Sequence, residues 1–261
     1  IHLLVKNFYL NDFDNMYSVE RPSTSGYILE IKKTNSDGSA GWSKNLLFYN
    51  DNSCARYDLI NNCYINSIEV TGPDEFYLIF TKLVGTSFNS QLFGDTNGDG
   101  MHSNFHNIPS GTHSESRTIV VLYHNSSGWR WGHNIESENY HIGTLTTGEL
   151  VSGHDVDSNN NLIITSKPNQ QNNQDVHLLT SFNATGKKWS KEMTIIPRDD
   201  AIIEYESKFI RSDISNTDLN YLVQTNQSMN FDGQQINCPV NSELGMCYIW
   251  LKIDENGSKT M

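Results

Sequence analysis

Residues 176–189 read VHLLTSFNATGKKW, an apolar run followed by Asn183, by Gly186 three residues later, and by Trp189. Branched and aromatic side chains in such a run favour an extended, half-buried strand. An Asn starts a turn by bonding its own backbone, and Gly adopts the positive φ that the turn requires. The segment therefore predicts a β-hairpin whose returning strand can place one large Trp ring in the core.

The same unit of apolar run, Asn or Asp, Gly and usually Trp recurs three more times along the chain. These copies are centred on 35–38 with Trp42, on 125–128 with Trp131, and on 254–257 with Thr260 in place of the Trp. A second strand-turn-strand pattern falls between them, at 68–80, 154–165 and 209–223. Two alternating hairpins give four strands per unit, which is the number in one blade of a β-propeller.

The repeat predicts an all-β fold, a β-propeller of four-stranded antiparallel blades. About four blades fit into residues 1–261, which we interpret as one propeller domain or as a fragment of a larger ring. The units are long for propeller blades, and inserted loops account for the excess. The longest insertion covers about 85–116, and a second covers 228–245.

Charge and cysteine spacing limit the classes of function. The formal net charge of −12 argues against a nucleic-acid surface and against binding to anionic lipid. No apolar run of membrane-spanning length occurs. The cysteines form two pairs with one spacing, Cys54 with Cys63 and Cys238 with Cys247. Two short disulfide loops predict an oxidising, extracellular or cell-surface location, and four free thiols in a cytosolic protein are the alternative.

The long insertion carries the most specific local motif, a candidate calcium loop. Oxygen-bearing side chains alternate in DTNGDG at 95–100, and Gly100 permits a sharp turn, as in the first half of a calcium-binding loop. An EF-hand is not predicted, because His106 stands where the bidentate Glu would be. The predicted ligands are Asp95, Asn97, Asp99, the carbonyl group of Met101, and Ser103 directly or through water. An acidic turn that binds no ion is the alternative.

The segment 154–189 also resembles a known repeat family. Its VDSNNNLIIT stretch at 156–165, followed by a strand, Asn183, Gly186 and Trp189, is similar to the bacterial and archaeal surface β-propeller repeats of the SBBP type. The resemblance implies a secreted or cell-surface propeller and supplies no catalytic residues. The loss of the Trp at Thr260 and the long units depart from this pattern.

The functional prediction is a non-enzymatic extracellular module for adhesion, ligand binding or surface assembly, stabilised by Ca²⁺. We expect a protein or carbohydrate ligand and no nucleic acid, with a homo-oligomer or filament as a further possibility. No nucleophile elbow, phosphate-binding loop or dinucleotide fingerprint occurs in the sequence. The alternatives are a structural subunit of a filament or surface layer, and a carbohydrate-active glycosidase or lyase. Sequons predict surface glycans at Asn125, Asn183, Asn226 and Asn256.

Overall fold

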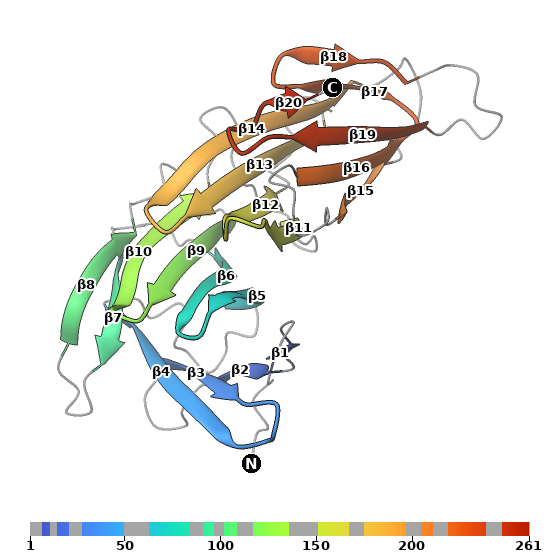
Figure 1. The fold of residues 1–261 in the computed structure, drawn as a ribbon. Helices are drawn as coiled ribbons and strands as arrows, with labels where there is room; N and C mark the ends of the chain where they lie inside the picture. Colours follow the sequence, from blue (N-terminus) through green and yellow to red (C-terminus); the bar gives the residue numbers. More distant parts are fainter. Residues whose placement is uncertain are drawn as a thin grey trace. The chain divides into compact units, whose positions relative to one another are not determined.

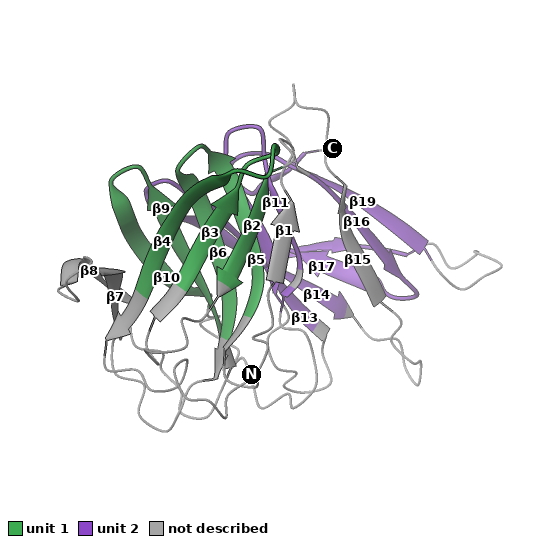
Figure 2. Ribbon diagram, turned by 90° about the horizontal axis from the view of Figure 1, so that it is seen from below, with its two compact units in different colours: residues 1–135 green, residues 136–261 purple. Residues whose placement is uncertain are grey.

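The computed structural model describes residues 7–10, 15–20, 28–49, 63–83, 91–96, 102–108, 117–135, 151–166, 175–196, 205–210, 219–238 and 247–260. In these residues the regular structure consists of β-strands joined by turns, which confirms the all-β prediction (Figure 1). The chain divides into two compact units, residues 1–135 and 136–261 (Figure 2).

Unit 1 contains two antiparallel sheets. Sheet A has the order β1-β2-β3-β4-β7-β8 and consists of β1 (Asn7–Leu10), β2 (Met16–Glu20), β3 (Ile28–Thr34), β4 (Ala40–Tyr49), β7 (Gln91–Thr96) and β8 (His102–Ile108). Sheet B has the order β10-β9-β6-β5 and consists of β5 (Cys63–Gly72), β6 (Glu75–Leu83), β9 (Arg117–Asn125) and β10 (Gly128–Ile135). The chain thus leaves sheet B after β6, adds β7 and β8 to sheet A, and returns.

Unit 2 is built in the same way. Sheet C has the order β11-β12-β13-β14-β17-β18 and consists of β11 (Val151–Val156), β12 (Leu162–Ser166), β13 (Asp175–Asn183), β14 (Gly186–Ile196), β17 (Ser228–Phe231) and β18 (Gln234–Ile236). Sheet D has the order β15-β16-β19-β20 and consists of β15 (Tyr205–Ile210), β16 (Leu219–Thr225), β19 (Cys247–Ile253) and β20 (Lys259–Thr260).

The two units share one topology, strand for strand. Each strand pairing in unit 1 has a counterpart in unit 2 between the strands numbered ten higher, and all of these pairings are antiparallel. The repeating structural element is therefore two four-stranded meanders plus one hairpin, β7–β8 or β17–β18. In sequence this hairpin lies between strands of one sheet, but it pairs with the other sheet of its unit, and we name it the exchanged hairpin. The repeating element is twice as large as the unit that the sequence repeat suggests.

The predicted hairpins form the meanders. The turns with Gly38, Gly128, Gly186 and Gly257 join the third and fourth strands of sheets A, B, C and D, and all four glycines have positive φ. The second predicted pattern joins the first and second strands of sheets B, C and D. At the Asp157 turn, one carboxylate oxygen accepts the backbone N–H groups of Asn159 and Asn161, both at 2.8 Å. These turns confirm the turn chemistry expected from the sequence.

The two stretches predicted as inserted loops contain strands. The first contains β7 and β8, and the second contains β17 and β18. Met229 and Phe231 of β17 are buried while their neighbours are half-buried, and Asp232 and Gly233 form the turn with positive φ. Lys191 of β14 bonds the Asp232 carboxylate at 2.6 Å, so the turn is tied to the sheet that it extends. The pairing partner of each hairpin is distant in sequence, which hides it from local pattern analysis.

The core of unit 1 lies between sheets A and B and is rich in aromatic rings. Phe76 stacks on Trp42 at a centroid distance of 5.4 Å and on His124 at 4.8 Å. Trp129 meets Phe76 edge-on at 5.6 Å. The sequence predicted that Trp131 would fill the core, but Trp129 is the buried ring of that hairpin, at 1% exposure, and Trp131 is half-buried. A β-bulge between the two residues changes the register of β10 and sets which ring faces inward.

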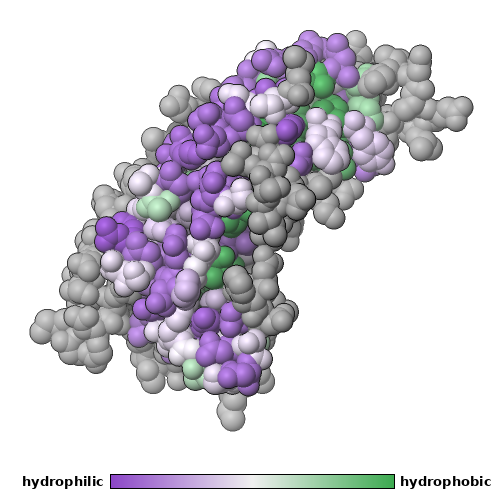
Figure 3. All heavy atoms as spheres, viewed as in Figure 1, coloured by the Kyte–Doolittle hydropathy of each residue, from purple (hydrophilic) through white to green (hydrophobic). Residues whose placement is uncertain are grey.

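The core of unit 2 lies between sheets C and D. Sheet C contributes Ile163, Leu179, Met193 and Ile195, and sheet D contributes Tyr221, Val223, Ile249, Leu251 and Ile253. Trp189 packs against this cluster, and its indole N–H donates to the carbonyl group of Glu255 at 3.0 Å. Hydrophilic side chains cover most of the described surface in the view of Figure 3.

Candidate functional site

The outward face of sheet D carries two large aromatic side chains in solvent. Along β19 the residues alternate between buried and exposed, so that Cys247, Ile249, Leu251 and Ile253 face the core. Tyr248 is 67% exposed and Trp250 is 58% exposed, and they are the exposed large hydrophobic residues of the described chain. Because large rings in water cost free energy, a strand that holds two of them outward is a candidate binding surface.

The register of sheet D defines the surroundings of the two rings. Tyr248 pairs with Gln224, Trp250 with Leu222, and Lys252 with Asn220. Directly opposed residues of an antiparallel pair share one face. We name this surface the aromatic face; its residues are Asn220, Leu222, Gln224, Tyr248, Trp250 and Lys252. The indole N–H of Trp250 donates to the Asn220 side-chain oxygen at 2.9 Å, a diagonal contact that restrains the ring.

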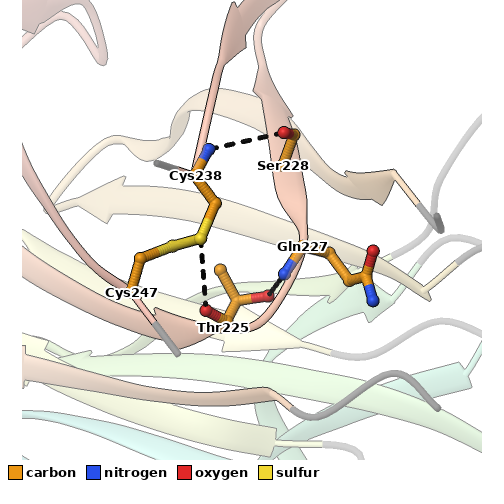
Figure 4. The surroundings of a disulfide bond; sticks show 5 residues. All are labelled: Thr225, Gln227, Ser228, Cys238 and Cys247. Carbon is orange, nitrogen blue, oxygen red and sulfur yellow. Dashed lines mark hydrogen bonds between the residues drawn. A yellow bond between two sulfur atoms is a disulfide. The ribbon is translucent and has the colours of Figure 1, made fainter. Parts of the chain in front are cut away.

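The disulfide between Cys238 and Cys247 fixes the start of β19 (Figure 4). Cys238 follows β18 of sheet C and Cys247 opens β19 of sheet D, with Cα atoms 5.8 Å apart, so the bond joins two sheets. The Cys238 N–H donates to the Ser228 hydroxyl at 3.4 Å, and both cysteines are buried. This bond confirms the predicted pairing of Cys238 with Cys247. Tyr248 is the residue that follows the cross-link.

Replacing Cys238 and Cys247 together by Ser should lower the free energy of unfolding of unit 2 by about 2–3 kcal/mol. A cross-link that closes a loop of about ten residues removes this much unfolded-state entropy at 25 °C. Equilibrium urea unfolding without added oxidant or reductant measures the difference in the free energy of unfolding between wild type and the double variant. Equal unfolding free energies would show that the inter-sheet bond adds no stability.

The corresponding face of sheet B differs in chemistry and in burial. The face of sheet B turned away from sheet A carries Tyr77, Ile79, Ile119, Val121 and Tyr123, all at most 2% exposed. The face of sheet D turned away from sheet C carries two amides and a lysine around its two rings. The centre of this face is therefore apolar and buried in unit 1, with Glu69 and His133 paired to its edges, whereas in unit 2 the face holds two exposed rings.

The side chains of the aromatic face suit the binding of a polar ligand. Flat rings offer a π-face to polarised C–H groups, and the adjacent amides of Asn220 and Gln224 offer hydrogen-bond donors and acceptors. On β16 and β19 the charged residue of this face is Lys252, and β15 adds Glu206 and Lys208 at the positions opposite Gln224 and Leu222. The chemistry expected of this surface is stacking plus hydrogen bonding to a polar ligand.

The predicted calcium ligands lie largely outside the described residues. Asn97, Asp99 and Met101 fall outside them. Asp95 belongs to β7 and Ser103 to β8, and their Cα atoms are direct partners across the hairpin. Within the described ranges, no group of three or more His, Cys, Asp or Glu side chains is arranged to hold a metal ion. The calcium site remains a prediction, and the hairpin pairing places its first and last ligands opposite each other.

The other predicted sites fall at strand ends and turns. Cys63 belongs to β5, and its predicted partner Cys54 lies outside the described residues. Asn183 closes its turn by accepting the backbone N–H of Thr185 at 2.9 Å and the Thr185 hydroxyl at 2.7 Å. Asn256 is exposed. The two remaining sequons lie at the end of β9, at Asn125, and between β16 and β17, at Asn226, so glycosylation stays a prediction at all four.

A second aromatic group lies on sheet B. Trp131 stacks on Tyr123 at 5.4 Å, and Tyr77 meets Tyr123 at 5.1 Å. The Tyr123 hydroxyl donates to the Glu75 carboxylate at 2.6 Å. Burial, followed by this hydrogen bond and the negative charge of Glu75, raises the pKa of Tyr123 well above its ordinary value. The group is a buried structural network, in contrast to the open aromatic face of sheet D.

The raised pKa of Tyr123 predicts a loss of stability in alkali. The folded chain holds the Tyr123 proton more tightly than the unfolded chain, so protonated Tyr123 adds to the free energy of unfolding. This stabilisation is complete below about pH 10, and above it the free energy of unfolding falls by at most about 1.4 kcal/mol per pH unit. Urea unfolding between neutral and strongly alkaline pH measures the slope. Tyr123→Phe should flatten it, and a slope unchanged by this substitution would contradict the assignment.

Comparison of the chain with family models, with curated proteins and with solved structures finds no match. In the described part of the chain, no helix is long and apolar enough to cross a membrane.

Proposed function

We propose that the chain is a non-enzymatic binding module of an extracellular or cell-surface protein, built from β-propeller blades, whose aromatic face holds a protein or carbohydrate ligand. The observation that carries the proposal is the exposure of Tyr248 and Trp250 on a strand whose alternate residues are all buried. A rigid sheet that holds two rings outward loses little conformational entropy when a ligand binds.

The architecture of each unit supports propeller blades. Each of the four sheets contains a four-stranded antiparallel meander. The first strands of neighbouring sheets lie close together, β1 with β5 in unit 1 and β11 with β15 in unit 2. Residues 76–80 of β6 and 162–166 of β12 are buried on both faces of their sheets. Propeller blades are four-stranded sheets arranged around a channel and packed face to face, so these features agree with blades.

The disulfide supports the proposed location. The Cys238–Cys247 bond persists in oxidising surroundings such as the outside of a cell, whereas cytosolic thiols are kept reduced. The net charge of −12 suits a soluble surface and the attraction of divalent cations.

We further propose that Ca²⁺ binds the predicted ligands in residues 95–103. At about 1 mM calcium, a level typical of extracellular calcium modules, binding should raise the thermal midpoint of the full chain and add about 1–3 kcal/mol to its stability. Differential scanning calorimetry with calcium and with excess chelator measures the shift. Asp95→Ala combined with Asp99→Ala should abolish the shift. A wild-type thermal midpoint that is the same with calcium and with chelator would contradict calcium binding.

Binding of the full chain to a printed array of oligosaccharides and secreted proteins tests the proposed function. Wild type should bind at least one ligand, and Tyr248→Ser should lose that binding while keeping the wild-type thermal midpoint, because Tyr248 is largely exposed. Trp131→Ala removes an aromatic ring from unit 1 and serves as the control that retains binding. A Tyr248→Ser variant that binds the array as wild type does would exclude the aromatic face as the site.

A further inference from the structure

We infer that the aromatic face binds a neutral, β-linked glycan with glucose-like stereochemistry, with Tyr248 and Trp250 stacking on its sugar rings. This inference rests on the proposed function, since it names the ligand class of the same face. Residues two apart on a strand are spaced by about 7 Å, comparable to the size of a sugar ring. A glycan lying along β19 can therefore meet both rings.

The stereochemistry of the ligand follows from the flatness of the rings. A β-glucose unit has its ring hydroxyls in equatorial positions, which leaves axial C–H groups on both faces of the sugar. These polarised C–H groups complement the negative π-face of an aromatic ring. The hydroxyls then point outward from the edge of the sugar, toward neighbouring side chains. On this face the half-buried neighbours Asn220 and Gln224 offer amide groups at the height of the sheet.

The restraint on Trp250 favours a pre-formed platform. Its N–H is already bonded to Asn220 on the neighbouring strand, and Leu222 lies directly opposite it on β16. The disulfide at Cys247 fixes the chain one residue before Tyr248. Both side chains have few rotatable bonds, so ordering them costs little on binding. The two rings and their amides are thus held on one rigid strand pair.

The polarity of the aromatic face argues against a covering protein sheet. The buried centre of the outward face of sheet B consists of Tyr, Ile and Val side chains on β6 and β9. A sheet packed on the aromatic face would bury Asn220, Gln224 and the Lys252 ammonium group, at a free-energy cost unless each is paired. The register also places Glu206 and Lys208 of β15 opposite Gln224 and Leu222. With Lys252 the face thus has two lysines and one glutamate, in a chain of net charge −12, and this is too little positive charge to select a polyanion.

Native affinity electrophoresis of the full chain in gels that contain hydroxyethylcellulose tests the inference, since this polymer is a neutral β-linked glucan. Wild type should be retarded, and Tyr248→Ser and Trp250→Ser should each weaken binding by about tenfold or more. Tyr248→Phe is the matched control, because it keeps the ring and should keep most of the retardation. The thermal midpoint of each variant confirms folding, and the exposed position of Tyr248 keeps the test valid if Trp250→Ser is unstable.

The outcomes separate this inference from the proposed function. Retardation by polygalacturonate and not by hydroxyethylcellulose would contradict the inference that the ligand is a neutral glycan. Array binding to a protein that Tyr248→Ser abolishes, with no retardation by either polymer, would also overturn the glycan and would leave the proposed function standing. Self-association of wild type that Tyr248→Ser abolishes, seen by analytical ultracentrifugation, would assign the face to a second copy and overturn the inference.

Discussion

Trp129→Ala should lower the free energy of unfolding of unit 1 by about 3–5 kcal/mol, the usual cost of removing a fully buried Trp. The Trp129 ring contacts Phe76 and His124 edge-on, with centroid distances of 5.6 and 5.1 Å. Its indole N–H points to the carbonyl oxygen of Asn45 on β4, at 3.5 Å, so the ring bridges sheets A and B. Truncation leaves a cavity between the two sheets.

Trp131→Ala is the matched control for Trp129→Ala. Trp131 lies two residues further along β10, is half-buried, and stacks on Tyr123. Its removal should cost about 1–2 kcal/mol, from a lost aromatic contact and partial burial. Equilibrium urea unfolding followed by far-ultraviolet circular dichroism compares the two variants. If Trp131→Ala proved as costly as Trp129→Ala, the register of β10 would be wrong.

Gly257→Ala should destabilise unit 2 by about 3 kcal/mol. Gly257 has φ +79°, and a Cβ atom there would lie 2.7 Å from Cδ2 of Trp189. The Trp189 ring is held over this turn by its hydrogen bond to the Glu255 carbonyl group, so it cannot move aside without breaking that bond. The expected cost adds about 1–2 kcal/mol for the left-handed backbone to about 1–3 kcal/mol for overpacking.

Gly38→Ala isolates the backbone part of this cost. Gly38 has φ +82° and occupies the equivalent turn of sheet A, where a Cβ atom would meet no heavy atom within 4 Å. We expect about 1–2 kcal/mol for this variant. Thermal unfolding of both variants gives the difference, and equal losses would show that the contact between Gly257 and Trp189 is not tight in solution.

Local turn chemistry explains why much of the fold is predictable from the sequence. An Asn or Asp that bonds its own backbone and a Gly with positive φ define a hairpin without reference to the rest of the chain. The four hairpins with Gly38, Gly128, Gly186 and Gly257 therefore follow from the sequence, and so do the four-stranded meanders. The arrangement of these sheets as propeller blades depends on contacts between sheets and stays a proposal.

The exchanged hairpins were less visible in the sequence, because β7 and β17 pair with β4 and β14 from distant parts of the chain. One local signal was available: Asp232-Gly233 follows the alternating residues Ser228–Phe231, and Asp-Gly is a strong hairpin signal. The duplicated topology depends on the long-range pairing of both hairpins. The bulge between Trp129 and Trp131 likewise is defined by the pairing of β10 with β9, so the sequence of β10 alone does not reveal it.

The candidate site was not predicted from sequence, because Tyr248 and Trp250 lie in the run CYIWLKI, in which both alternating sets contain large apolar residues. Which set is buried depends on the packing of sheet D against sheet C. The Cys238–Cys247 bond was predictable from spacing and is confirmed. The calcium motif at 95–103 remains a prediction from spacing alone.

Hydroxyl-radical footprinting of the full chain, read by mass spectrometry, tests the central claim that the aromatic face is an open binding surface. In the free protein Tyr248 and Trp250 should be oxidised readily, and Trp129, at 1% exposure, should be spared. Adding hydroxyethylcellulose should protect Tyr248 and Trp250 and leave the other tryptophans unchanged. Resistance of Tyr248 and Trp250 to oxidation in the free protein would contradict the claim, because another part of the assembly would then cover the face.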